Sequence, residues 1–253
     1  MHVSRPFPVR CALLLLPALF ALSAGATPLD GYVAAADPAY GYTIASTEHV
    51  TDAYGSYTLY EIQMTSLTWR TASEVNHPTW KHWLTVAVPD TLRSDTALLV
   101  INGGSRTAGG PSNISEYLGL ATALTGSILA LVEQVPYQPL RFPDFPGRNF
   151  TEDEIIAYSF DKYLATGDPT WPVLLPMVKS SVRAMDTIAA VVADQHSITL
   201  DKFVIGGGSK RGWTTWLTAA VDSRVVACAP IVIDVLNMAP SMDHHRKCYG
   251  TYS

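Results

Sequence analysis

A glycine-rich turn between a short apolar strand and a helix constrains this chain more than any other segment. Residues Lys202–Gly212 read Lys-Phe-Val-Ile-Gly-Gly-Gly-Ser-Lys-Arg-Gly, and Trp213–Val221 have the composition of a helix. A serine held on a sharp strand-to-helix turn is typical of a nucleophile elbow, whose backbone is tight and needs small neighbours. The segment predicts a sheet covered by helices and makes Ser209 a candidate nucleophile.

The hydrophobic pattern places this turn inside an α/β fold. Residues 57–70 and 82–89 alternate apolar and polar side chains, as half-buried antiparallel strands do. Later apolar runs are continuous, which indicates strands covered on both faces. We expect such strands within 97–101, 127–132, 203–205 and 225–234, and helices over 115–124, 152–165 and 174–195. The result is a mainly parallel sheet with antiparallel N-terminal strands and an elbow after the third parallel strand, an α/β-hydrolase-like arrangement.

The N-terminus predicts export from the cytoplasm. Arg5 and Arg10 precede the apolar run Cys11–Ala24, and small residues follow at 24–26. This order is typical of a signal peptide over residues 1–26, and an uncleaved anchor is the alternative. We therefore expect a secreted or periplasmic protein with one domain over residues 27–253, and no later apolar run is long enough to span a membrane.

Charge and cysteine content exclude several classes of function. The chain carries a formal net charge of −5 and has no block of Lys and Arg, which argues against nucleic acid as a partner. Cys228 and Cys248 remain after signal removal and would either form a disulfide or stay unpaired. Their spacing is not that of a metal site, so we expect no metal and no cofactor.

The residues around the serine match the usual Gly-x-Ser-x-Gly motif only in part. Gly207 lies two positions before Ser209, but Arg211 stands two positions after it and the glycine comes later, at Gly212. The alternative is a plain glycine-rich turn or an anion-binding helix N-terminus. The loop Asn102-Gly-Gly-Ser105, which follows an earlier buried strand, favours the elbow.

An acyl-transfer site also needs oxyanion donors, an acid and a base. We expect the donors to be the backbone N–H groups of Lys210 and Gly104, although Gly104 would also suit a tight turn. Asp234 follows the fourth buried strand and is the candidate acid, with a loop or N-cap role as the alternative. His244 and His245 follow Asp234 too closely to be the base, which we expect this chain to lack.

Aromatic residues and the other histidines are assigned to the interior. The tryptophans within residues 69–83 and the proline-rich loop 136–146 would either line a pocket or form core and cover, and we favour core and cover. His77 and His82, which flank two of the tryptophans, are read as structural residues.

Six blocks of sequence resemble the PhoPQ-activated pathogenicity-related protein family. They are His77–Pro89, Val135–Phe142, Glu152–Tyr158, Trp171–Ser180, Gly208–Trp213 and Ile233–Met238. The resemblance implies a secreted or periplasmic α/β-hydrolase-like protein. It also implies that this chain is truncated at its C-terminus, because members are longer and the expected histidine lies in the part without a counterpart.

The elbow is similar to that of glucuronoyl esterases as well. In those enzymes a basic residue follows the serine, as Lys210 does here, and in some the acid follows the strand that corresponds to residues 225–233. That resemblance is the best support for Asp234.

Three functional readings follow from these features. The first is a serine hydrolase that transfers an acyl group from a small-molecule or glycan ester to water through Ser209. The second is a secreted binding or signalling protein, related to growth or virulence, on a hydrolase fold. The third is a degenerate fragment that has no independent fold and leaves a sheet edge open.

Overall fold

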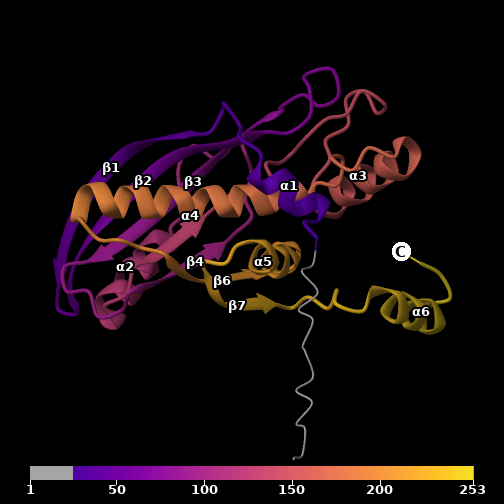
Figure 1. Ribbon diagram of the computed structural model, residues 1–253. Coiled ribbons are helices and arrows are strands. Elements are labelled where there is room, and N and C mark those ends of the chain that lie inside the picture. The colour runs from indigo at the N-terminus through magenta and orange to yellow at the C-terminus, as the bar shows by residue number, and fades with distance from the viewer. Residues whose placement is uncertain (1–24, 253) are drawn as a thin grey trace, which may run out of the picture.

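The computed structural model describes residues 25–252, so nearly all of the predicted signal peptide lies outside the described residues. Helices and strands alternate along most of the chain, and their arrangement is shown in Figure 1. In chain order the elements are α1 (Pro28–Ala34), β1 (Gly41–Asp52), β2 (Gly55–Thr68), β3 (Thr79–Pro89), β4 (Thr96–Ile101), α2 (Ile114–Thr125), β5 (Leu129–Val132), α3 (Glu152–Thr166), α4 (Leu174–His196), β6 (Lys202–Gly208), α5 (Lys210–Val221), β7 (Val225–Ile231) and α6 (Met238–Tyr249).

The described strands form one seven-stranded mixed sheet in the order β1-β2-β3-β5-β4-β6-β7. Neighbours from β1 to β5 are antiparallel, and the pairs β5-β4, β4-β6 and β6-β7 are parallel. The predicted α/β class, with antiparallel N-terminal strands and a parallel part, is therefore confirmed. The turn that carries Ser209 follows β6, the third of the parallel strands along the chain, as predicted.

Helices cover both faces of this sheet. On one face α4 packs on β2 and β3, α5 packs on β6 and β7, and α1 packs on α4. On the other face α2 contacts β2, β3 and β5, where Leu118 meets Tyr57 and Leu129. The long helix α4 runs across the sheet in Figure 1 and buries the apolar stripe of its sequence, which includes Met177, Met185 and Ile188. The two-sided cover explains why the central strands are continuously apolar.

The last described elements lie at the periphery. Strand β7 pairs with β6 and exposes Val226 and Ile231, and α6 buries none of its residues and lies apart from the other elements in Figure 1. Cys228 lies on β7 and Cys248 on α6, and both are free thiols. The structure therefore decides the open question of their pairing in favour of unpaired cysteines.

Candidate active site

Ser209 occupies a strained backbone conformation between β6 and α5. Its φ of 55° and ψ of −122° lie outside the regions that residues with a side chain ordinarily adopt. The Ser209 N–H donates to the Ile231 carbonyl oxygen at 2.9 Å, and the Trp213 N–H donates to the Ser209 carbonyl oxygen at 3.1 Å. These bonds on either side hold the sharp strand-to-helix turn that the sequence predicts.

Two glycines give helix α5 the room to start directly against the sheet. A Cβ atom at Gly207 would lie 2.8 Å from the Arg211 Cβ and carbonyl oxygen. A Cβ atom at Gly212 would lie 2.6 Å from the Ile233 Cγ2 atom and 3.0 Å from the Gly207 carbonyl oxygen. Separations of 2.8 and 2.6 Å are shorter than side chains tolerate. Gly212 therefore provides the close approach that a glycine two positions after the serine usually provides.

Arg211, at the position where the usual motif has glycine, is a buried structural cation. Its Nε donates to the Val135 carbonyl oxygen at 2.6 Å. Its Nη1 and Nη2 donate to the two carboxylate oxygens of Glu152 at 2.9 and 2.7 Å. This bidentate pair joins the first turn of α5 to the start of α3. Sequence patterns did not predict this pair, although an arginine where a small residue is expected was a usable signal.

The predicted oxyanion loop lies at the same sheet edge as Ser209. Strands β4 and β6 are neighbours, and Ile101 of β4 pairs with Gly207 of β6. Gly104 lies three residues after Ile101, and Ser209 lies two residues after Gly207. Adjacent strands are about 4.8 Å apart. The Arg211 guanidinium fills the space beside the Gly103 Cα, where a Cβ atom would overlap it.

Hydrogen bonds fix the backbone of this loop. The Gln134 N–H donates to the Gly103 carbonyl oxygen at 2.7 Å, and the Val135 N–H donates to the Asn102 carbonyl oxygen at 3.1 Å. Gly104 has a φ of +121°, which favours glycine. The backbone N–H groups of Gly104 and Lys210 donate to no acceptor among residues 25–252. Both predicted oxyanion donors are thus unused by the fold.

Glu152 is held as a carboxylate at the start of α3. Its N–H donates to the Gln138 Oε1 at 2.8 Å, and the Gln138 Nε2 donates back to its carboxylate at 2.7 Å. The Lys210 Nζ lies 3.6 Å from the Glu152 carboxylate and 3.1 Å from that of Asp153. Burial raises the pKa of Glu152, but the bonds from Arg211 and Gln138 and the charges of Arg211 and Lys210 outweigh it. The net result is a pKa below the ordinary value.

The candidate acid is at the same sheet edge but is not engaged. Gly208 pairs with Ile231, and Asp234 follows three residues later as an exposed residue outside any helix or strand. Its carboxylate makes no hydrogen bond or ion pair with a described residue. No histidine within residues 25–252 is hydrogen-bonded to the Ser209 hydroxyl either. The structure thus brings together Ser209, Lys210 and Gly104, and leaves Asp234 unconnected to a base.

Most of the described histidines have partners elsewhere. His49 pairs with Asp90, His196 bonds Tyr60, and His244 contacts Cys248. His82 is fully buried, as its structural role predicts. Its Nδ1 donates to the Glu133 carbonyl oxygen at 2.9 Å, and its Nε2 accepts from the Ser66 hydroxyl at 2.8 Å. Burial lowers the pKa of His82 to about 4, against smaller opposing effects of backbone hydrogen bonds, so the ring is neutral.

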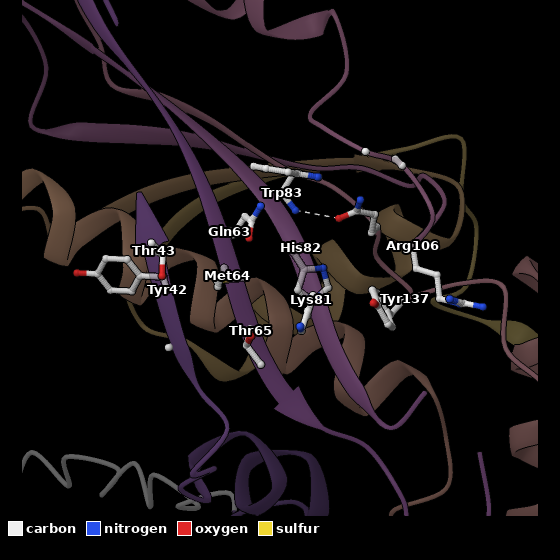
Figure 2. A pocket seen from close by; sticks show the side chains of 14 residues that line it. Tyr42, Thr43, Gln63, Met64, Thr65, Lys81, His82, Trp83, Arg106 and Tyr137 are labelled. Carbon is white, nitrogen blue, oxygen red and sulfur yellow. Dashed lines mark hydrogen bonds between the residues drawn. The ribbon is translucent and has the colours of Figure 1, made fainter. Parts of the chain in front are cut away.

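A pocket of about 520 Å³ opens beside the loops that follow β4 and β5 (Figure 2). Trp69 and Trp80 are buried in the core, as expected. Trp83 and Tyr137 instead help to line this pocket, so the assignment of their segments to core and cover is only partly right. The lining consists of Gly41, Tyr42, Thr43, Gln63, Met64, Thr65, Lys81, His82, Trp83, Arg106, Ala108, Gly109, Gln134 and Tyr137.

Two further kinds of feature are absent from residues 25–252. No group of three or more His, Cys, Asp or Glu side chains in this part of the chain has a metal-binding arrangement. None of its helices has the length and apolar character needed to cross a membrane.

Comparison with known proteins identifies relatives over most of the chain. The model of the PhoPQ-activated pathogenicity-related protein family matches residues 29–253. The autocrine proliferation repressor protein A of Dictyostelium discoideum is 37% identical over 243 residues, which are 95% of this chain and 48% of that protein. This chain therefore spans about half the length of that relative.

Solved structures of lower similarity are esterases. Acetyl xylan esterase 1 from Thermoanaerobacterium is 14% identical with a TM-score of 0.47, over 87% of this chain and 67% of that one. The glucuronoyl esterase from Solibacter usitatus is 15% identical with a TM-score of 0.44, over 77% and 52% of the two chains. The extent of the family match and the identity to the Dictyostelium protein carry the assignment: this chain belongs to the PhoPQ-activated pathogenicity-related protein family.

Proposed function

We propose that this protein is a secreted or periplasmic serine hydrolase of the esterase type, with Ser209 as its nucleophile. The observation that carries the proposal is the strained backbone of Ser209 at the start of α5. The N–H groups of Lys210 in this helix and of Gly104 in the loop after β4 make no hydrogen bond to another described residue. Strain at a serine is retained where surrounding structure over-determines it, and such residues cluster at active sites.

The proposed reaction begins when the Ser209 oxygen attacks the carbonyl carbon of an ester. Negative charge then develops on the carbonyl oxygen and is stabilised by the N–H groups of Lys210 and Gly104 and by the N-terminal end of α5. The alcohol leaves, and water hydrolyses the acyl group from Ser209. The substrate class is a small-molecule or glycan ester.

No histidine among residues 25–252 is hydrogen-bonded to the Ser209 hydroxyl, which needs a base to accept its proton. We assign this base to a histidine in a longer form of the protein, with Asp234 as the acid that orients it. On this proposal, residues 27–253 form the part of an α/β-hydrolase-like domain that carries the nucleophile and the oxyanion donors.

The second candidate function is a secreted binding or growth-signalling protein on the same fold. It is favoured by the name of the Dictyostelium relative, an autocrine proliferation repressor, and by the absence of a histidine bonded to Ser209 among the described residues. This candidate requires no activated serine.

Labelling with a fluorophosphonate probe separates the two candidates. The samples are this chain, a longer form of the protein, and the longer form with Ser209→Ala or with the exposed control substitution Ser223→Ala. Labelling of the longer form that persists in Ser223→Ala and disappears in Ser209→Ala is expected. Labelling of this chain alone would show that its base is present after all. If no folded sample labels, the hydrolase proposal fails and the signalling candidate replaces it.

A further inference from the structure

The pocket of Figure 2 occupies the part of one sheet face that α2 leaves uncovered. Tyr57, near the start of β2, packs against α2, and side chains on a strand alternate between the two faces. Gln63 and Thr65 therefore lie on the same face as Tyr57, farther along β2. Their cross-strand partners Trp83 and Lys81 extend the pocket floor onto β3.

The side chains that line the pocket carry positive charge, and no acidic side chain in the lining neutralises it. None of its fourteen lining residues is acidic, and two of them, Lys81 and Arg106, are cations. The Arg106 Nε donates to the Pro139 carbonyl oxygen at 2.7 Å, and its two terminal nitrogens have no acceptor among the described residues. Lys81 is exposed and forms no ion pair with the described part of the chain. A concave site with one sign of charge attracts ligands of the opposite sign.

The rest of the lining suits a ring that carries hydroxyl groups. The aromatic side chains of Trp83 and Tyr137 offer flat surface, and Figure 2 shows Tyr137 and Arg106 on the side of the pocket opposite β1. Thr43 and Gln63 are cross-strand partners and supply a hydroxyl and an amide. Aromatic faces with a few placed polar groups are the usual composition of a small-molecule site.

The pocket adjoins the proposed oxyanion loop. Gln134 lines it, and the Gln134 backbone N lies 3.7 Å from the Cβ position of Gly104. The Gln134 side chain is already committed, since its Oε1 accepts from the Trp83 N–H at 2.8 Å. Arg106 follows β4 and Gln134 follows β5, so both lie at the carboxyl ends of parallel strands. In open α/β sheets this edge is where ligands bind.

We propose that this pocket binds an anionic monosaccharide unit, with its acidic group on Lys81 and Arg106 and its ring against the aromatic side chains. The guanidinium fork of Arg106 fits a carboxylate or a phosphate, and the lysine adds a second charge. Binding at this pocket does not require Ser209 to be a nucleophile, so the inference stands apart from the proposed esterase reaction.

Saturation-transfer NMR titrations at low salt test the inference on protein that carries Ser209→Ala, which removes any turnover. The ligands are glucuronate, galacturonate, glucose 6-phosphate and neutral glucose. At least one acidic sugar is expected to bind roughly tenfold or more tightly than glucose, because only it engages the two cations. The comparison of the uronates with the sugar phosphate identifies the acidic group that the pocket prefers.

Charge variants locate the binding. Lys81→Gln is expected to weaken the acidic sugar about fivefold to tenfold and to leave the affinity for glucose unchanged. Lys247→Gln is the matched control, because Lys247 is an exposed lysine on α6 with no ion pair among the described residues. Arg106→Lys keeps one positive charge but loses the guanidinium fork, and it should weaken binding again. Circular dichroism and melting temperature establish that each variant is folded.

Two results would overturn the inference. The first is equal affinity for glucose and all three acidic sugars, including no binding of any of them by folded protein. The second is an affinity in Lys81→Gln that equals that of Lys247→Gln. Because every titration uses Ser209→Ala protein, these results are independent of whether Ser209 reacts with fluorophosphonates.

Discussion

Substitution of Glu152 by glutamine should destabilise the protein far more than its surface position suggests. The Glu152 side chain is 33% exposed, but its partner Arg211 is only 11% exposed and has no other charged partner within hydrogen-bond distance among the described residues. Glutamine has the same shape and removes only the charge. It also turns one of the two carboxylate oxygens into an N–H₂ group that faces the donors of Arg211.

The structure sets the magnitude of this loss. Two charge-assisted hydrogen bonds join Arg211 to Glu152, and bonds of this kind contribute about 1.5–3 kcal/mol each. Removal of one partner from a fully buried pair costs about 3–5 kcal/mol. Water reaches the exposed third of Glu152, and the glutamine oxygen keeps one bond to Arg211. We therefore expect the free energy of unfolding at neutral pH to fall by about 2–3 kcal/mol.

The effect should depend on pH in a defined direction. The pKa of Glu152 is lowered in the folded protein, so the carboxylate contributes its full stabilisation above the ordinary pKa of a glutamate. That contribution is lost as the pH falls through the lowered folded pKa. The difference in stability between the wild-type protein and Glu152→Gln should therefore be largest at neutral pH and shrink in acid.

Urea unfolding followed by circular dichroism measures both quantities. The control is Asp153→Asn, which makes the same charge change at the next residue, where the side chain is 81% exposed and contacts Lys210. Exposed ion pairs contribute about 0–1 kcal/mol, so the control should lose well under 1 kcal/mol. Equal, small losses in the two variants, or a difference that does not shrink in acid, would refute the argument that Arg211 depends on Glu152.

Two further predictions concern the elbow and the buried histidine. Gly207→Ala should lower the free energy of unfolding by about 2 kcal/mol or more, because its Cβ would collide with Arg211, whereas Gly208→Ala has no atom within 4 Å and should be nearly neutral in the same urea experiment. The pKa of His82 is lowered to about 4, so the unfolded chain takes up a proton at pH values where the folded chain does not. The free energy of unfolding should therefore decrease as the pH is lowered from about 6.5 to about 4. His82→Asn should be less stable at neutral pH, since Ser66 loses one of its two hydrogen-bond partners, and should lack that slope in a series of unfolding curves.

Most of the sheet could be predicted because its strands carry a strong local signal. The apolar runs of β4, β5, β6 and β7 are short and separated by amphipathic helices, although β7 buries none of its residues where the sequence predicts a buried strand. Strand β1 was missed because most of its residues are exposed and its sequence alternates only weakly. Helix α6 was missed because it buries nothing and therefore has no apolar stripe to detect.

The site could be predicted only as far as the backbone determines it. Ser209, Lys210 and Gly104 follow strands whose neighbourhood the α/β pattern implies, so their common location at one edge was within reach. The bond between Arg211 and Glu152 joins residues 59 positions apart through side chains. A pattern of hydrophobic periods contains no information about such a contact.

The displaced glycine at position 212 affects how sequences of this kind should be searched and designed. A scan for Gly-x-Ser-x-Gly passes over this chain, although its backbone makes the same turn. One residue along a helix corresponds to a rotation of about 100°. With the glycine at position 212, position 211 is therefore free to carry a side chain that leaves the helix in a different direction. Here that side chain is Arg211, which packs against Gly103 and donates to the Val135 carbonyl oxygen, so it supports the neighbouring loop. A designer who wants a rigid donor loop beside a serine could copy this spacing, with an arginine before the glycine and a glutamate at the start of a separate helix.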